Sequence, residues 1–231
     1  MTKTFNIAID GPAGSGKSSV SKEFAKRHPE FLYINTGAMF RTYALFLIQN
    51  NIDPTDLEAI KKALKVVNVE LEADKVYMVT ENSKVDVTDT VKAMEVAKVA
   101  SIIASLPIVR EKLLIDQRNI AAKNNVIMDG RDIGTVVLPN AQLKIYLEAS
   151  SKERATRRLK ELKELHPDQE FDLLQIQKEI DERDYKDMNR EIAPLKKADD
   201  AVILDTDGLT VATCCDAIED IYNKRVAELS K

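Results

Sequence analysis

The sequence contains few of the residues that build metal centres, disulfide frameworks or membrane spans. Its 231 residues include no tryptophan, two cysteines and two histidines. Cys214 and Cys215 are adjacent, so they form neither a disulfide framework nor a zinc-ligand spacing, and His28 and His166 are each followed by proline. The longest apolar run, from about Ala44 to Ile48, is far shorter than the ~20 residues of a membrane-spanning helix. Disulfide-rich, zinc-binding and membrane-spanning classes are therefore not expected.

The net charge and the N-terminal residues exclude further classes of protein. The formal net charge is −4, from 34 basic and 38 acidic residues, which removes the argument for a general nucleic-acid binder. The start, Met1 to Asn6, lacks the basic and apolar stretches of a signal peptide. We expect a cytoplasmic, water-soluble protein that binds small molecules rather than nucleic acid or membrane. No apolar surface stripe stands out, so a monomer is expected.

Short apolar runs alternate with helical segments along the chain. Consecutive apolar positions suit strands buried on both faces of a parallel sheet, and alternation with helices indicates an α/β sandwich. The expected strands are Phe5–Ile9, Phe31–Ile34, Val126–Met128, Leu143–Leu147 and Ala201–Leu204, with early helices at Ser18–Arg27 and about Ala38–Gln49. Cys214 and Cys215 fall in an expected C-terminal helix, where two buried thiols are predicted.

One stretch has a different period. Residues Val66 to Val87 alternate apolar and polar side chains, with turns expected at Ala73-Asp74 and Glu81-Asn82-Ser83. A period of two predicts a small antiparallel meander exposed on one face. It is expected as an insert between two helical pieces of the α/β fold.

The first strand leads into a phosphate-binding loop. Gly11 to Ser18 matches G-x-x-x-x-G-K-[ST] between a strand and a helix, as this motif requires. Its glycines let several backbone N–H groups point at one phosphate, and the helix N-terminus adds partial positive charge. Lys17 is expected to reach the β- and γ-phosphates and Ser18 to bind Mg²⁺. The pattern indicates a nucleoside triphosphate but says nothing about what accepts the phosphate.

Two later segments offer candidates for an acceptor site. Thr36 is expected to cap the second helix, and Arg41 lies one turn further on. The segment Asp129-Gly130-Arg131-Asp132 follows the third strand. Its first acid is a candidate for orienting Mg²⁺-bound water, and the glycine is expected to place the next two residues over the sheet edge. Ligands bind at the carboxyl ends of strands in open parallel sheets.

Arginine is concentrated in the charged helical region that follows. Six of the eleven arginines lie between Arg131 and Arg190. Arg154, Arg157 and Arg158 share one helix face, as do Arg183, Lys186, Asp187 and Arg190. Solvated faces with salt bridges are the ordinary interpretation of such spacings. Beside a P-loop, we interpret them instead as parts of a lid that closes over phosphates and excludes water.

With these segments in view, the sequence closely resembles the bacterial cytidylate kinases, which are nucleoside monophosphate kinases. The resemblance runs almost from end to end. Its most specific parts are the Gly-Arg-Asp-Ile-Gly-Thr-Val-Val segment from Gly130 and the Arg-x-Ile-Ala-Pro-Leu segment from Arg190, which adenylate and shikimate kinases lack. The other matching segments are Ile9–Pro12, Asn35–Arg41 and Glu182–Asp187.

This resemblance implies a three-layer P-loop fold with a five-stranded parallel sheet, an inserted meander and a short helical lid. The domains would be a CORE of residues 1–63 and 106–231, an insert of the acceptor-binding domain at 64–105, and a lid at 150–190. The implied reaction transfers the γ-phosphoryl group of ATP to CMP or dCMP with Mg²⁺. A kinase that uses UMP and CMP alike, and a non-catalytic P-loop nucleotide-binding module, are the alternatives.

The resemblance also implies roles for individual residues. Ser101, Arg110 and Asp132 would bind the cytosine edge; an acid suits the exocyclic amine and disfavours the carbonyl of uracil. Thr36, Arg41, Arg131 and Arg190 would bind the acceptor phosphate, Arg183 and Asp187 the sugar. The predicted ATP-binding residues are Gly11, Pro12, Ala13, Gly14, Ser15, Gly16, Lys17, Ser18 and Ser19. The predicted catalytic residues are Lys17, Arg131, Arg157, Arg158 and Arg190.

Three positions depart from the family pattern. Phe40, a predicted acceptor-binding residue, stands where the family usually has tyrosine, so a hydroxyl contact to the acceptor would be missing. Lys186 replaces an arginine found in many members, which exchanges a bidentate fork for a point charge. Ser19 stands where threonine is frequent. The first two departures are expected to affect acceptor binding or the choice between ribose and deoxyribose.

Overall fold

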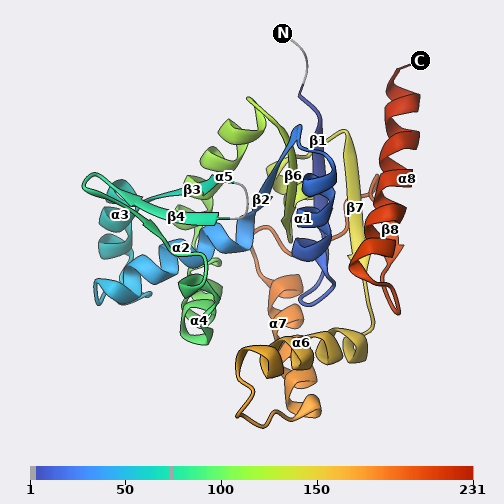
Figure 1. The fold of residues 1–231 in the computed structure, drawn as a ribbon. Helices are drawn as coiled ribbons and strands as arrows, with labels where there is room; N and C mark the ends of the chain where they lie inside the picture. The colour runs from blue at the N-terminus through green and yellow to red at the C-terminus, as the bar shows by residue number, and fades with distance from the viewer. Residues whose placement is uncertain (1–3, 73–74, 231) are drawn as a thin grey trace. The chain divides into compact units, whose positions relative to one another are not determined.

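A computed structural model describes residues 4–72 and 75–230 of the chain (Figure 1). Its principal sheet has five strands in the order β2-β6-β1-β7-β8, and the β1–β6, β1–β7 and β7–β8 pairs are parallel. A second sheet has three antiparallel strands in the order β3-β4-β5. The predicted α/β fold with a parallel sheet and an antiparallel meander is confirmed. The described residues divide into two compact units, one running to Phe31 and resuming at Asn125, the other Leu32–Asn124.

The first unit contains the P-loop and most of the parallel sheet. Its strands are β1 (Asn6–Asp10), β6 (Asn125–Gly130), β7 (Leu143–Glu148) and β8 (Val202–Asp205). Its helices are α1 (Lys17–Arg27), α6 (Ser151–Leu165), α7 (Leu173–Asn189) and α8 (Val211–Leu229), with one π-helical turn at Ile133–Val137. Both thiols of α8 are buried, as predicted.

The strand register determines which loops meet at the sheet edge. In the β1–β6 pair Asp10 lies level with Gly130, and in the β1–β7 pair it lies level with Tyr146. Ile7, Ala8 and Ile9 are fully buried, as consecutive apolar positions predict. The loop after β1 and the loop after β6 therefore leave the sheet side by side at its carboxyl edge.

An aromatic cluster packs α8 against α1 and the start of β1. The ring of Tyr222 lies 5.5 Å from Phe24 and 5.3 Å from Phe5, and both pairs are edge-on. Arg27 extends this contact with ion pairs to Asp216 and Glu219 on α8. The C-terminal helix is therefore held by apolar packing as well as by charge.

Helices α6 and α7 form a pair with its own small apolar core. Ala155 and Leu162 of α6 pack with Ile176 and Ile180 of α7, and Phe171 adds to the cluster. The chain breaks between the two helices at His166, as predicted. The pair occupies the segment for which a lid is predicted.

The second unit begins within β2 (Phe31–Asn35), from Leu32 onward. Helix α2 (Thr36–Gln49) starts one residue earlier than its predicted cap allows, because the Asn35 side chain accepts the Ala38 N–H at 2.7 Å. The prediction that Thr36 caps this helix is wrong, since Thr36 is its first helical residue. The remaining helices are α3 (Leu57–Val66), α4 (Met94–Ile103), α5 (Pro107–Ala121) and a 3₁₀ turn at Thr90–Lys92.

The meander consists of β3 (Asn68–Glu72), β4 (Lys75–Thr80) and β5 (Ser83–Asp86). In β4 the apolar residues Val76 and Met78 are buried, as the period of two predicts. The predicted turn at Ala73-Asp74 lies outside the described residues. Lys84 of β5 pairs with Glu70 and Glu72 of β3 across the exposed surface.

Candidate active site

The loop between β1 and α1 has the backbone that the P-loop motif requires. Gly11 has φ +148°, and a Cβ there would lie 2.3 Å from the carbonyl oxygen of Leu147, which excludes every side chain. Gly16, at φ +87°, is the residue before the first turn of α1. The loop therefore turns sharply and delivers the N-terminus of α1, with its partial positive charge, to this edge of the sheet.

The side chain of Lys17, the first residue of α1, folds back into the P-loop rather than into solvent. Its Nζ donates to the carbonyl oxygen of Pro12 at 2.6 Å and to Ser15 Oγ at 3.3 Å, and the residue is 6% exposed. Burial lowers the pKa of the Lys17 ammonium well below its usual value, and the positive charge of Arg131 lowers it further. A bound phosphate would oppose both effects, because it brings negative charge to this ammonium.

Ser18 and Asp129 form the pair of oxygen groups that suits a magnesium ion. Ser18 Oγ donates to Asp129 Oδ2 at 2.8 Å, where β6 nears its end. Hydroxyl and carboxylate oxygens are the ligands of Mg²⁺ in phosphate-binding sites, where phosphates and water complete the shell. The described residues contain no group of three or more His, Cys, Asp and Glu side chains placed to hold a metal ion.

Asp10 joins the P-loop strand to the loop after β6. Its two carboxylate oxygens accept the N–H groups of Ile133, at 2.9 Å, and Gly134, at 2.7 Å. Burial raises the pKa of this carboxyl to about 6, although both hydrogen bonds act in the opposite direction. A Cβ on Gly134 would lie 3.4 Å from Asp10 Oδ2 and 3.2 Å from Cδ of Lys144. The tight fit holds the segment that carries Arg131 and Asp132.

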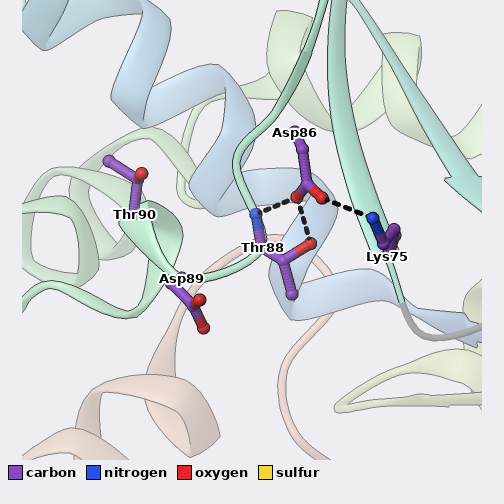
Figure 2. A pocket seen from close by; sticks show the side chains of 5 residues that line it. All are labelled: Lys75, Asp86, Thr88, Asp89 and Thr90. Atoms are coloured by element: carbon purple, nitrogen blue, oxygen red, sulfur yellow. Dashed lines mark hydrogen bonds and ion pairs between the residues drawn. The ribbon is translucent and has the colours of Figure 1, made fainter.

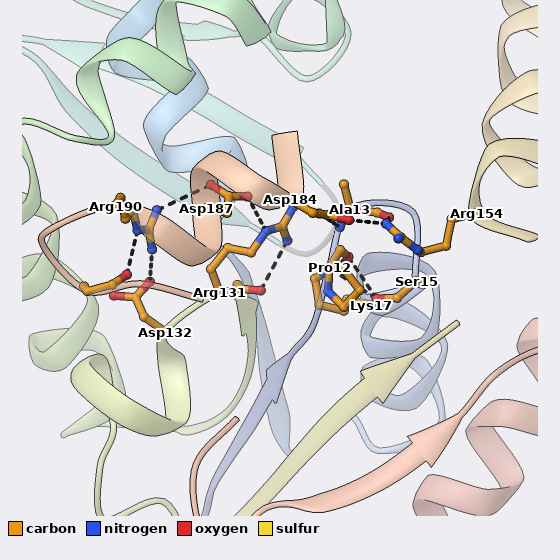
Figure 3. A network of polar contacts seen from close by, with 12 residues as sticks. Pro12, Ala13, Ser15, Lys17, Arg131, Asp132, Arg154, Asp184, Asp187 and Arg190 are labelled. Atoms are coloured by element: carbon orange, nitrogen blue, oxygen red, sulfur yellow. Dashed lines mark hydrogen bonds and ion pairs between the residues drawn. The ribbon is translucent and has the colours of Figure 1, made fainter. Parts of the chain in front are cut away.

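Two arginines and two aspartates meet where this segment approaches α7 (Figure 3). Arg131 Nε donates to Asp187 Oδ2 at 2.9 Å, and Arg190 Nη2 donates to Asp132 Oδ1 at 3.3 Å. Arg190 also donates to the carbonyl oxygen of Ala193 at 2.6 Å. These four side chains come from predicted site positions far apart in the sequence, and all four are mostly buried. Each guanidinium is therefore fixed in place by carboxylate and carbonyl oxygens.

The other predicted arginines of the helix pair have different surroundings. Arg157 donates to Glu153 at 3.0 Å and to the hydroxyl of Thr206 at 3.1 Å, and that hydroxyl donates in turn to the carbonyl oxygen of Glu148 at 3.0 Å. A Cβ on Gly16 would lie 3.7 Å from Arg157 Nη1. Arg158 is half-buried and pairs with Glu161. Arg183 is exposed, yet its charge lowers the pKa of Lys17. Within this unit, Arg157 therefore lies beside Gly16 of the P-loop, whereas Arg158 pairs with a residue of its own helix.

The predicted acceptor residues of the second unit lie on three helices. Thr36 is buried at the start of α2, and the Arg41 guanidinium folds back to within 3.3 Å of where a Gly37 Cβ would stand. Arg110 of α5 lies 5.7 Å above the ring of Phe40 and donates to the carbonyl oxygen of Ala104 at 3.0 Å. Ser101 is exposed on α4. Phe40 therefore places its ring against one of the predicted cytosine-binding residues.

A pocket of about 400 Å³ lies beside the meander (Figure 2). It is lined by Lys75, Asp86, Thr88, Asp89 and Thr90. Asp86 accepts the Thr88 hydroxyl at 2.6 Å and its N–H at 3.0 Å, and these bonds, followed by the charge of Lys75, lower the pKa of Asp86 to about 2. The carboxylate is occupied by its own neighbours, so this pocket is not a candidate active site.

Two contributors to the site were missed by sequence reasoning. Asp10 precedes the motif directly, and its place at a strand end was a usable signal that it faces the neighbouring loop. Asp184 lies in the matching segment Glu182–Asp187, but its partner Ala13 is 171 residues away. No local sequence pattern predicts a contact between residues so far apart in the chain.

A P-loop with a buried lysine, a serine–aspartate pair and arginines brought in by a helix pair define a P-loop phosphotransferase. The model of one family, described as cytidylate kinase, matches residues 7–224. The chain therefore belongs to the cytidylate kinase family.

Three relatives show how far the similarity extends. The chain is 46% identical to a cytidylate kinase of Fusobacterium nucleatum over 217 residues, which cover 94% of this chain and 93% of the relative. It is 43% identical to the cytidylate kinase of Ureaplasma urealyticum, with 98% and 99% covered. The cytidylate kinase of Listeria innocua is also 43% identical over 98% of this chain and 99% of its own. The similarity thus spans both units.

Among solved structures, an uncharacterized protein from Eubacterium ventriosum is similar in fold. Its TM-score is 0.50 at 14% sequence identity, and the match covers 96% of this chain and 99% of that one. This likeness concerns the fold alone. No helix in the part of the chain that the structure describes is long and apolar enough to cross a membrane.

Proposed function

We propose that this kinase transfers the γ-phosphoryl group of Mg-ATP to CMP or dCMP, giving ADP and CDP or dCDP. The observation that carries the proposal is the meeting of Arg131, Asp132, Asp187 and Arg190 in the same unit as the P-loop. A nucleotide-binding module needs the loop, but it does not need a second set of buried arginines for another phosphate. The family membership supports the choice of cytidine nucleotides. We extend the proposal to a monomer that acts in cytoplasmic pyrimidine nucleotide metabolism.

The donor nucleotide would bind at Gly11–Ser19. The backbone N–H groups of the loop and the start of α1 would hold its phosphates. The Lys17 ammonium would leave the Pro12 carbonyl oxygen and bind phosphate oxygens instead. Their negative charge would compensate the buried positive charge of Lys17. Ser18 and Asp129 would hold Mg²⁺, directly or through water, and the ion supplies neutralisation of the β- and γ-phosphate charge.

The acceptor nucleotide would bind with its phosphate at Thr36, Arg41, Arg131 and Arg190, and its sugar at Arg183 and Asp187. Ser101, Arg110 and Asp132 would bind the cytosine. Asp132 can accept from the exocyclic amine of cytosine, whereas uracil places a carbonyl there and leaves two acceptors opposed. Arg190 pairs with Asp132 at 3.3 Å and so would orient this carboxylate in the proposed site.

Transfer then depends on position and charge. An oxygen of the acceptor phosphate forms a bond to the γ-phosphorus while the bond from that phosphorus to the β,γ-bridging oxygen breaks, and ADP leaves. Lys17, Arg131, Arg157, Arg158 and Arg190 are the proposed groups that stabilise the spread charge. Closure of α6 and α7 as a lid would exclude water, which otherwise competes as the acceptor.

The first experiment is steady-state ADP production with Mg-ATP across CMP, dCMP, UMP, AMP and GMP at low acceptor concentration. A kcat/KM for CMP or dCMP at least about a hundredfold above that for UMP is expected from the mismatch at Asp132. Equal use of UMP would leave a pyrimidine kinase but remove the role of Asp132. Tight ATP binding with no turnover on any acceptor would contradict the proposed reaction itself.

A further inference from the structure

Both backbone polar groups of one P-loop residue, Ala13, are held by the helix pair (Figure 3). The Ala13 N–H donates to Asp184 Oδ1 of α7 at 2.9 Å. The Ala13 carbonyl oxygen accepts from Arg154 Nη1 of α6, also at 2.9 Å. Arg154 and Asp184 pair with each other as well. The P-loop is therefore connected to both helices at a single residue.

The Arg154–Asp184 pair is buried and its polar atoms are occupied. Arg154 is 7% exposed and Asp184 is 5% exposed. Arg154 Nε donates to the carbonyl oxygen of Ala149 at 3.1 Å, while the two oxygens of Asp184 are divided between Ala13 and Arg154. A buried pair of this kind adds little net stability, but removal of one partner alone is costly because it leaves an uncompensated buried charge.

Gly14 shows that this approach is close. A Cβ on Gly14 would lie 3.1 Å from Cβ of Arg154 and 3.3 Å from its carbonyl oxygen. A side chain at this position would push α6 away from the loop, and the residue has φ +76°, which glycine adopts readily. The backbone of α6 and the P-loop therefore pack as one surface, and a shift of the helix pair must move the loop or break the pair.

Asp184 lies on the same helix as side chains of the proposed acceptor site. Asp187 lies three residues further along the same helix and accepts from Arg131, and Arg190 follows at the helix end. One rigid helix thus carries the proposed acceptor-binding side chains and the carboxylate that holds the P-loop. A ligand that fixes the last turn of this helix therefore also restricts the adjacent turn, which carries Asp184.

We infer that the Arg154–Asp184 pair is a positioning device that couples acceptor binding to the ATP loop, a role that rests on the function proposed above. An acceptor bound at Arg131, Asp187 and Arg190 holds α7. Asp184 then holds the Ala13 peptide, which sets the loop for the donor phosphates. Since coupling free energies are reciprocal, bound ATP tightens acceptor binding by the same factor.

The test measures this coupling directly and avoids turnover. Titration calorimetry gives the Kd of the β,γ-imido analogue of ATP, with Mg²⁺, in the absence and presence of saturating CMP. For the wild-type chain we expect CMP to lower this Kd by about tenfold, within the usual range of coupling. Asp184→Asn keeps an oxygen for the Ala13 N–H but removes the charge pair, and it should reduce the factor to below about twofold.

A matched control separates coupling from loss of charge or stability. Glu179→Gln removes one carboxylate from the exposed surface of the same helix and should retain the wild-type factor. Arg154→Lys keeps the charge but not the planar fork that serves three acceptors, so an intermediate factor is expected. Thermal melting will show whether Asp184→Asn folds. If it does not, the double variant Asp184→Asn/Arg154→Met, which leaves no unpaired charge, is used in its place. The same low factor is expected of it.

Two results would overturn the inference: a wild-type factor near one, or a wild-type factor retained when the pair is removed. Failure of the proposed function is seen separately, as absence of CDP formation by the wild-type chain. If the wild-type chain makes CDP and the Asp184→Asn variant keeps the wild-type coupling factor, the proposed function stands and the coupling role of the pair is excluded.

Discussion

The two units of this kinase use charged side chains in opposite ways. In the P-loop unit, Asp10, Lys17, Arg154 and Asp184 are buried and bind backbone groups of loops. In the second unit, the charges of the meander are exposed and pair with one another, as Lys84 does with Glu70. Buried charge fixes loop geometry at a site, whereas exposed charge mainly keeps a strand edge solvated. Substitutions should therefore have large effects in the first unit and small ones in the second.

The largest effect is expected for Arg131→Ala. The positive charge of this guanidinium lowers the pKa of Lys17, and the group pairs with Asp187, so its removal takes a positive charge from the proposed path of the phosphoryl group. We expect kcat/KM for CMP to fall by about 10³-fold while the chain stays folded and binds ATP. Steady-state kinetics with circular dichroism checks this, and nearly intact turnover would remove Arg131 from the catalytic residues.

Gly11→Ala is expected to have the next largest effect. The added Cβ would meet the Leu147 carbonyl oxygen at 2.3 Å, and φ +148° is unsuitable for alanine. The free energy of unfolding should fall by roughly 3 to 4 kcal/mol. Gly208→Ala, where φ is +70° with no atom within 4 Å, is the control and should cost only about 1 kcal/mol in chemical denaturation. Equal losses would show that the contact with Leu147 is unimportant.

The buried carboxyl of Asp10 predicts a specific dependence of stability on pH. Its pKa is raised from 3.8 to about 6, so the native state holds this proton more tightly than the unfolded chain does. The free energy of unfolding should therefore fall as pH rises from about 4 to about 6, by about 3 kcal/mol from this group. The comparison is urea denaturation of the wild-type chain and Asp10→Asn at pH 4 and pH 7. A constant difference between them would contradict the raised pKa.

A smaller effect is expected in the second unit from Phe40→Tyr. The ring lies against Arg110, and the added hydroxyl would restore the group that the family usually has here. We expect the KM for CMP to fall by about fivefold, the value of one hydrogen bond. Acceptor titration at saturating ATP measures it. An unchanged KM would mean that the hydroxyl has no role in this chain.

The smallest effect is expected for Lys84→Ala in the meander. This lysine pairs with Glu70 and Glu72, yet all three side chains are exposed, so solvent screens the attraction. The Tm should stay within about 2 °C of the wild-type value, and kcat/KM should not change. A larger loss of Tm would show that exposed pairs in this unit matter as much as the buried ones of the first.

The fold was predictable from the sequence because its signals are local. Consecutive apolar residues identify β1, β6 and β7, and the alternation in β4 identifies the meander. Errors arise where neighbours compete for one role: Asn35, not Thr36, caps α2. The π-helical turn at Ile133–Val137 was not predicted, since it depends on Asp10, more than 120 residues earlier.

The site was predictable where a motif or a resemblance identified its residues. The P-loop backbone is present, and four of the predicted side chains meet in the structure, while the binding and catalytic roles of the arginines stay predictions. The spacing of Arg154, Arg157 and Arg158 suggested one anion-binding face, but each takes a different partner. Helix spacing determines which face a side chain leaves from, and only tertiary packing determines whether that face meets a loop, a neighbouring strand or water.

The buried thiols of α8 make this kinase well suited to site-specific labelling. Burial raises the pKa of Cys215 to about 11 and also raises the pKa of Cys214. Both thiols therefore remain protonated and shielded at neutral pH. The chain also contains no tryptophan. A cysteine or tryptophan introduced on the exposed surface of α6 or α7 would therefore report on those helices alone, against a background without competing labels or indole fluorescence.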